Sequence, residues 1–126
     1  MTEAGGPRTI LVVDDEATML ELIRAILEPA GYRLVEATSA TRALDLLDEA
    51  QPDLVLLDVA MPGLSGFTAC HEIRRRSRAR VVIVSAHASA DDRARGMAAG
   101  ASDYLAKPFR SGELLGVIER TLRDAV

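Results

Sequence analysis

The 126-residue sequence has no tryptophan, two tyrosines and two phenylalanines, so a folded core has to be built from aliphatic side chains. Its single cysteine, Cys70, excludes an internal disulfide and fits a reducing cytoplasm. No apolar run approaches membrane-spanning length, and the first residues lack the apolar segment of a signal peptide. A net charge of −4 gives no general attraction to nucleic acid or to anionic membranes. We therefore expect a cytoplasmic domain with no membrane partner and no direct nucleic-acid binding.

Lysine is almost absent as well. Lys107 is the single lysine, and the other 14 of the 15 basic residues are arginine. Lysine provides a compact point charge on a flexible stem, whereas arginine provides a flat fork of donors. Lys107 is therefore a candidate functional residue, although a strong arginine bias would by itself leave few lysines.

Short apolar runs alternate with amphipathic segments along the chain. The pattern predicts strands at 9–13, 32–37, 54–57, 81–84 and 104–106. Helices are expected around 19–27, between Ser39 and Gln51, from Ser65 to about Arg75, over 91–99 and over about 110–124. Five strands alternating with five helices predict an α/β fold, with a parallel sheet covered on both faces. We expect one domain over 8–124, after a disordered lead at 1–7 and before a short tail at 125–126.

Two of these elements differ from the rest. The strand at 32–37 alternates between apolar and polar residues, which favours a place near an edge of the sheet. The helix at 91–99 contains Gly96, which weakens a helix by about 1 kcal/mol relative to alanine.

Chemically capable side chains follow four of the five predicted strands. Asp14 and Asp15 follow the first, Asp58 the third, Ser85 the fourth and Lys107 the fifth. If the strand order is 2-1-3-4-5, these four strand ends converge on one crevice at the carboxyl edge of the sheet. The second strand would lie outside the crevice, which explains why no such residue follows it.

Three carboxylates in one crevice repel one another and require a cation. Oxygen ligands without clustered histidine or cysteine favour a hard divalent ion, and we expect Mg²⁺. A hydroxyl at Ser85 and an ammonium at Lys107 suit the remaining oxygens of a phosphoryl group. Together these residues predict a phosphoryl-transfer site in which Asp58 is the nucleophile. Alternatively, Asp14 and Asp15 cap the first helix.

Four motifs carry a resemblance to a known family: DDE at 14–16, LLDVAMPGLSG at 56–66, VSAH at 84–87 and DYLAKPF at 103–109. In this order and spacing they resemble the receiver domain of two-component response regulators, over about residues 8–124. The resemblance implies a flavodoxin-like three-layer sandwich with strand order 2-1-3-4-5. It also implies that Asp58 accepts a phosphoryl group from a phosphohistidine on a sensor histidine kinase or a histidine phosphotransfer protein, with Mg²⁺ as cofactor.

The resemblance assigns further roles around Asp58. Asp15, Asp58 and the backbone carbonyl of Ala60 would bind the metal directly, and Asp14 would act largely through water. Lys107 would pair with the phosphoryl oxygens. Its peptide bond to Pro108 is often cis in the family. The Ser85 hydroxyl would move to the phosphoryl group.

The same resemblance implies a switch rather than a turnover enzyme. As the Ser85 hydroxyl moves, Tyr104 would rotate inward, although an aromatic residue near a strand end also serves for plain packing. The surface formed by 91–99, 104–106 and 110–124 would then control a downstream protein or a fused effector domain. Dimerisation through this surface is a further expectation.

Several residues allow two interpretations. His87, two positions after Ser85, either tunes the lifetime of the aspartyl phosphate, as Ala60 also would, or is a surface imidazole without a role. Cys70 is expected to be a buried filler and His71 to face solvent. The arginines at 74–76, 78 and 80 are interpreted as a solvated helix end rather than a nucleic-acid site, because no aromatic residue is interleaved with them.

Two functions compete with a phosphorylatable receiver. A Mg²⁺-dependent phosphohydrolase of the haloacid dehalogenase type would place its nucleophile after the first strand, with a second aspartate two residues later. Asp14, Asp15 and Glu16 do not have that spacing. A receiver fold used only as an unphosphorylated interaction module is disfavoured, because no site residue is missing.

Overall fold

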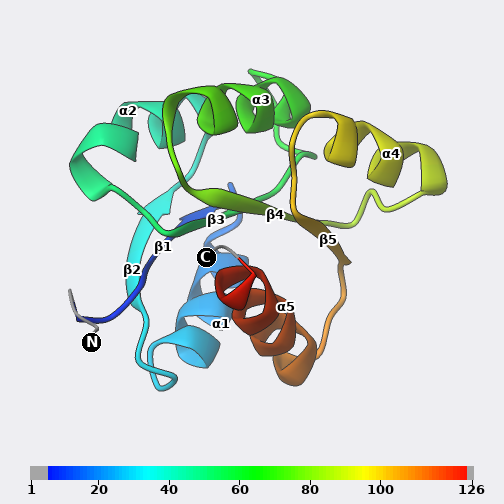
Figure 1. Cartoon of the computed structure of the whole chain (residues 1–126). Coiled ribbons are helices and arrows are strands. Elements are labelled where there is room, and N and C mark those ends of the chain that lie inside the picture. Colours follow the sequence, from blue (N-terminus) through cyan, green and yellow to red (C-terminus); the bar gives the residue numbers. More distant parts are fainter. Residues whose placement is uncertain (1–5, 125–126) are drawn as a thin grey trace.

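The computed structural model describes residues 6–124, which form a five-stranded parallel sheet between two layers of helices (Figure 1). The strands are β1 (Thr9–Val13), β2 (Arg33–Ala37), β3 (Leu54–Leu57), β4 (Arg80–Ser85) and β5 (Asp103–Ala106). The helices are α1 (Ala17–Leu27), α2 (Ala40–Ala50), α3 (Gly66–Arg76), α4 (Ala90–Ala98) and α5 (Ser111–Arg123). The strand order β2-β1-β3-β4-β5 confirms the predicted flavodoxin-like α/β fold. Residues 1–5 of the predicted lead, and the predicted tail at 125–126, lie outside the described residues.

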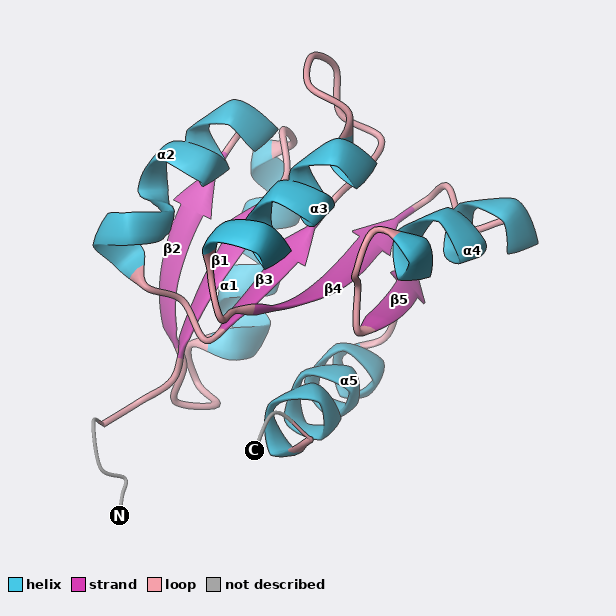
Figure 2. Cartoon of the chain, turned by 45° about the horizontal axis from the view of Figure 1, so that its top comes forward, coloured by secondary structure: helices cyan, strands magenta, loops and turns pink. Residues whose placement is uncertain are grey.

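Helices α2, α3 and α4 cover one face of the sheet, and α1 and α5 cover the other (Figures 1 and 2). Successive strand residues point to opposite faces, so each central strand supplies both halves of the core. The half under α2, α3 and α4 contains Val13, Leu57 and Ile83. The half under α1 and α5 contains Val12 and Leu56. Because both faces are covered, β1 and β3 are buried at every position, as their unbroken apolar sequences predict.

The strand boundaries differ from the predicted ones by single residues. Strand β4 starts at Arg80 and ends at Ser85, because Arg80 is paired with Leu54 of β3 and Ser85 with Ala106 of β5. Parallel pairing thus extends the strand beyond its apolar run. Strand β2 lies at one edge of the sheet and is only partly buried, as its alternating sequence predicts.

Serine side chains set the start of three helices. Ser39 and Ser65 cap α2 and α3 as predicted, by accepting a backbone N–H three residues later. The start of α4 differs from the prediction, because Ser89 and Asp92 form a reciprocal capping box. In the described part of the chain, every helix is too short or too polar to cross a bilayer.

Candidate functional site

The alternation along the strands also orients the polar residues that follow them. Asp14 continues the face of Val12, and Asp58 continues the face of Leu56. Lys107 follows Leu105 by two positions, and its side chain reaches both aspartates. Side chains from three strand ends therefore meet at the carboxyl edge of the sheet, where the strand order predicts a crevice.

Lys107 joins two of the carboxylates. Its ammonium donates to Asp14 Oδ2 at 2.7 Å and to Asp58 Oδ2 at 3.0 Å. Only 11% of the Lys107 side chain is exposed, against 3% for Asp14 and 8% for Asp58. Burial alone would lower the pKa of Lys107, but its hydrogen bonds to the two carboxylates and their negative charges outweigh burial and raise the pKa above its ordinary value. Lys107 is therefore a cation at neutral pH, and its bond to Pro108 is cis.

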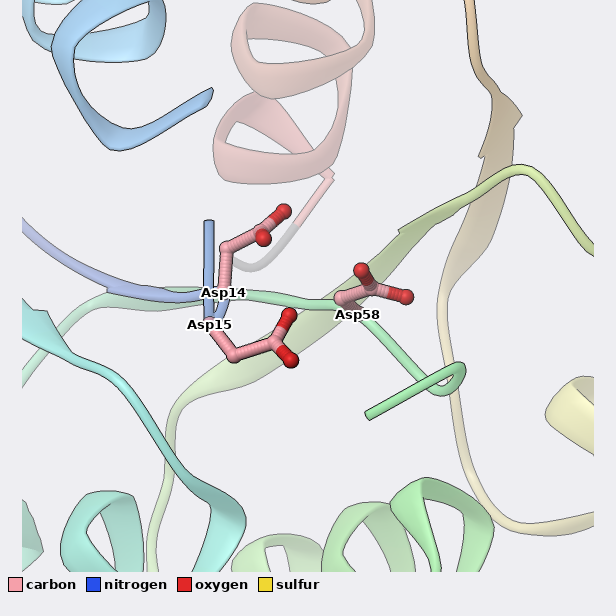
Figure 3. A group of neighbouring side chains, drawn as sticks. All are labelled: Asp14, Asp15 and Asp58. Carbon is pink, nitrogen blue, oxygen red and sulfur yellow. The ribbon is translucent and has the colours of Figure 1, made fainter. Parts of the chain in front are cut away.

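Asp15 completes an acidic cluster. One carboxylate oxygen from each of Asp14, Asp15 and Asp58 lies within 4.8 Å of the other two. Figure 3 shows Asp14 and Asp15 leaving the end of β1 on opposite sides, with Asp58 beside them at the end of β3. Asp15 is exposed, so the cluster opens to water on its side. One ammonium balances only part of the negative charge of three carboxylates. The carboxylate oxygens are the kind of ligand that Mg²⁺ binds.

The loop after β3 is held close to Asp58. The Ala60 N–H donates to Asp58 Oδ1 at 2.8 Å, so both oxygens of this carboxylate accept a hydrogen bond. The first residue of α3, Gly66, lies against Val59 of the same loop. A Cβ atom on Gly66 would lie 2.4 Å from Val59 Cα, closer than real Cβ atoms come to backbone. Sequence reasoning did not identify this role of Gly66, because the contact depends on how the loop folds back.

Ser85 is fully buried at the end of β4, and its backbone is hydrogen-bonded to that of Lys107 after β5. The Lys107 N–H donates to the Ser85 carbonyl at 2.9 Å. The Ser85 Oγ accepts the N–H of His87 at 3.1 Å, and the His87 carbonyl accepts the hydroxyl of Tyr104. His87 itself is exposed, whereas only 6% of Tyr104 is exposed. The predicted residues Ser85, His87 and Tyr104 are therefore linked by two successive hydrogen bonds.

Capping of the first helix explains only part of the role of Asp14. Asp14 Oδ1 accepts the N–H of Glu16 at 3.0 Å, and Glu16, not an aspartate, is the N-cap residue of α1. The other oxygen of Asp14 is bound to Lys107. One carboxylate thus shapes the local turn and also belongs to the cluster.

The remaining residues singled out in the sequence lie away from the cluster. Cys70 is buried on α3, and burial raises the pKa of its thiol to about 11. His71 is exposed, as expected. Of the arginine run, Arg75 and Arg76 lie in the last turn of α3 and pair with Glu72 there, which agrees with a solvated helix end.

The arrangement has the parts that phosphoryl transfer requires. Asp58 is a buried carboxylate in a cluster that opens to water at Asp15. The acidic cluster can hold a divalent cation, and Lys107 supplies a protonated donor beside the nucleophile. The described cluster has no histidine or cysteine within it. Positioning and charge neutralisation, rather than proton transfer, are the chemistry that these groups can provide.

Sequence comparisons agree with this geometry. A family model described as "Response regulator receiver domain" matches residues 10–119. The transcriptional regulatory protein YvrH of Bacillus subtilis is 41% identical over 116 residues, which are 91% of this chain and 49% of that protein. The phosphate regulon transcriptional regulatory protein PhoB of Escherichia coli is 41% identical over 119 residues, which are 92% of this chain and 52% of PhoB. The chain thus spans about half the length of the curated relatives it matches.

Solved structures share the whole fold. The receiver domain of the sensor histidine kinase PA1611 of Pseudomonas aeruginosa, determined with a magnesium ion in its active-site cleft, is 31% identical with a TM-score of 0.85, covering 94% of this chain and 99% of that one. The BeF₃-activated receiver domain of Klebsiella pneumoniae RstA is 30% identical with a TM-score of 0.86, covering 91% of this chain and 98% of that one.

Proposed function

The chain belongs to the response regulator receiver domain family of two-component systems, and from this we propose that Asp58 is its phosphoacceptor. The observation that carries the proposal is the position of the Asp58 carboxylate, within 4.8 Å of Asp14 and Asp15 and hydrogen-bonded by Lys107. The donor would be a phosphohistidine on a sensor histidine kinase or a histidine phosphotransfer protein. A carboxylate oxygen of Asp58 attacks the phosphorus, the P–N bond breaks, and its electron pair remains on the imidazole nitrogen.

The residues around Asp58 have distinct tasks in this reaction. Asp14, Asp15, Asp58 and the Ala60 carbonyl would hold Mg²⁺, which when bound neutralises the charge of the phosphoryl oxygens. Lys107 would exchange its carboxylate partners for a phosphoryl oxygen, so that its ammonium pairs with the transferred group. The Mg²⁺ ion in the cleft of the PA1611 receiver supports this cofactor.

Phosphorylation would act through Ser85 and Tyr104. A phosphoryl group on Asp58 provides new acceptors for the buried Ser85 hydroxyl, and Ser85 is linked to Tyr104 through the peptide groups of His87. The surface of α4, β5 and α5 then presents a different arrangement to a partner. That partner is a downstream protein, a fused effector domain, or a second copy of this chain in a homodimer. The BeF₃-activated RstA receiver and the two transcriptional regulators support this mode of output.

The residues of the switch belong to a domain over 8–124 that acts in the cytoplasm, where ATP-dependent kinases work and a lone cysteine remains reduced. The domain makes no direct contact with nucleic acid. Its own chemistry is limited to accepting and losing a phosphoryl group. A phosphohydrolase is disfavoured because the nucleophile follows β3 rather than β1.

One experiment separates the receiver from its alternatives. The protein is incubated with Mg²⁺ and acetyl phosphate, and intact mass and released phosphate are followed over time. A stoichiometric phosphoryl adduct that is lost in Asp58→Asn supports the receiver. Rapid release of phosphate over many turnovers supports a hydrolase, and no adduct supports a passive interaction module.

The lifetime of the adduct tests His87. Its imidazole is exposed two residues after Ser85, and we propose that it lies near the path of the attacking water. We expect His87→Ala to change the half-life of the aspartyl phosphate severalfold without changing the final stoichiometry. His71→Ala is the matched control, because His71 is exposed on α3 and is not linked to Ser85. Equal half-lives for wild type and His87→Ala would leave the imidazole without a role.

A further inference from the structure

Helix α4 is attached to the domain in an unusual way. Of its residues, Ala90–Ala98, only Gly96 is buried, so it lacks the apolar face by which α2 and α3 pack on the sheet. Besides Gly96, two of its arginines attach it by lying on aromatic rings. The guanidinium of Arg95 lies 4.3 Å from the ring centre of Phe67 on α3, and that of Arg93 lies 5.3 Å from the ring centre of Tyr104 on β5.

Arg93 makes two further contacts that Arg95 does not share. Its Nη1 donates to the Tyr104 carbonyl at 3.2 Å, and its Nε donates to the Ala88 carbonyl at 3.3 Å. Arg93 therefore bridges strand β5 and the loop between β4 and α4, which lie beside each other in Figure 2. The preceding carbonyl in that loop, of His87, accepts the Tyr104 hydroxyl. Two consecutive carbonyls of the loop are thus held by Tyr104 and by the arginine that covers its ring.

Gly96 provides the space for the Tyr104 ring. A Cβ atom on Gly96 would lie 2.8 Å from Ile83 Cδ1 and 3.0 Å from two ring carbons of Tyr104. Glycine in the middle of a helix lowers helix stability, so its presence here has to be explained by packing. A side chain at this position would require the Tyr104 ring and the end of Ile83 to shift.

We propose that Arg93 is a positioning residue that couples the loop after Ser85 to helix α4 and holds Tyr104 in its buried position before Asp58 is phosphorylated. The coupling follows a continuous series of contacts. Ser85 binds the His87 N–H, the His87 carbonyl binds Tyr104, and Arg93 binds both Tyr104 and the next carbonyl of the loop. A displacement of Ser85 is therefore transmitted to α4 through Arg93.

The functional consequence rests on the proposed phosphorylation of Asp58. If the phosphoryl group draws Ser85 inward, the loop has to adopt a position that the Arg93 bridge already favours. The loop and Tyr104 of the unphosphorylated protein are then already close to their arrangement in the switched state. Without Arg93, binding of a phosphoryl group would be weaker, because it would also have to order the loop and Tyr104.

The experiment uses the whole chain with Tyr32→Phe, which leaves Tyr104 as the sole tyrosine in a protein without tryptophan. Acrylamide quenching of Tyr104 fluorescence reports its burial without any phosphoryl group. Titration with beryllofluoride and Mg²⁺ then gives the midpoint for binding of a phosphoryl analogue. Urea unfolding of each variant separates these two readouts from general loss of stability.

We expect Arg93→Ala to make Tyr104 more accessible to acrylamide and to raise the beryllofluoride midpoint about two- to fivefold, the factor that one cation–π contact is worth at an exposed site. Arg95→Ala removes the same charge and a similar ring contact from the same helix, but it leaves Tyr104 covered, and both readouts should stay at the wild-type values. Arg93→Lys retains the charge without bridging two carbonyls, so its midpoint should lie between those of wild type and Arg93→Ala. Gly96→Ala retains Arg93 and should also expose Tyr104, although alanine favours the helix.

The results can overturn the proposal in three ways. Quenching of Tyr104 that is the same in wild type and Arg93→Ala would refute the positioning role. A beryllofluoride midpoint that is unchanged or lower in Arg93→Ala would refute the coupling. Equal effects of Arg93→Ala and Arg95→Ala would assign the change to helix charge. Failure of the proposed function would give a different result, because the wild-type protein itself would then bind no beryllofluoride. The quenching comparison would still test whether Arg93 positions Tyr104.

Discussion

Replacing Lys107 with methionine tests how the acidic cluster is held together without metal. The ammonium binds Asp14 at 2.7 Å and Asp58 at 3.0 Å, and only 3% and 8% of these two side chains are exposed. Removal of one partner of a buried ion pair costs about 3–5 kcal/mol, since the charge that remains is uncompensated. Methionine retains most of the apolar stem, and Asp15 opens the site to water. We therefore expect a loss of about 3 kcal/mol in the free energy of unfolding at neutral pH, the low end of that range.

Urea unfolding with EDTA measures this loss. With a slope of about 1.5 kcal/mol per molar urea, the midpoint of Lys107→Met should fall by about 2 M. Arg42→Met is the matched control, because Arg42 is exposed on α2, and its midpoint should stay close to wild type.

Magnesium provides the second arm of the same experiment. A divalent cation bound to the cluster replaces the lost ammonium, so millimolar Mg²⁺ should stabilise Lys107→Met more than wild type. The reasoning is refuted if the variant unfolds at the wild-type midpoint in EDTA, or if Mg²⁺ raises both midpoints equally.

Three further outcomes are expected. Burial raises the pKa of the Cys70 thiol from 9.0 to about 11, so at pH 8 its thiolate fraction is about a hundredfold lower than that of an ordinary cysteine. A thiol reagent should therefore label Cys70 slowly in the native protein and at once in guanidinium; rapid native labelling would contradict its burial. Gly66→Ala should lower the free energy of unfolding by about 1–3 kcal/mol, because its Cβ would meet Val59. Gly116→Ala in α5 is the control, because the space around Gly116 is open, and this change should be neutral or stabilising. Similar urea midpoints for the two variants would contradict the structure. Asp58→Asn should reduce the stabilisation by Mg²⁺ in thermal unfolding, and an unchanged shift would exclude this carboxylate as a ligand.

Simple periodicity was sufficient to predict the sheet and most of the acidic site. The apolar runs at 9–13 and 54–57 specify strands buried on both faces, and each is followed directly by aspartate. Once the strand order is known, alternation along the strands places Asp14 and Asp58 on one side of the sheet. The order itself was an assumption that the resemblance to receiver domains implied, and the structure confirms it.

The contacts that periodicity does not encode were missed. Gly96 was interpreted as a weakness of the helix, whereas the structure shows a close approach to Tyr104 and Ile83. Gly66 was not singled out in the sequence, but it lies against Val59 across the turn of the loop. Both roles depend on the distance between segments that are remote in the chain or folded back on each other, and no local pattern of residues reports such a distance.

Arg93 was missed for a different reason, and that reason bears on why α4 is the element that can switch. Lys107 was conspicuous as the only lysine, while Arg93 is one of 14 arginines. Its contacts are individually weak, with about 0.5–1 kcal/mol for the cation–π contact and about 1 kcal/mol for each hydrogen bond. A phosphoryl group adds hydrogen bonds to charged oxygens worth about 1.5–3 kcal/mol each, which is enough to move α4 together with the loop while the Arg93 bridge stays intact. The same energy cannot displace α2 or α3, because their buried apolar faces belong to the continuous core under the sheet. Helix α4, in which only Gly96 is buried, is therefore easier for a single phosphorylation to move than α2 or α3.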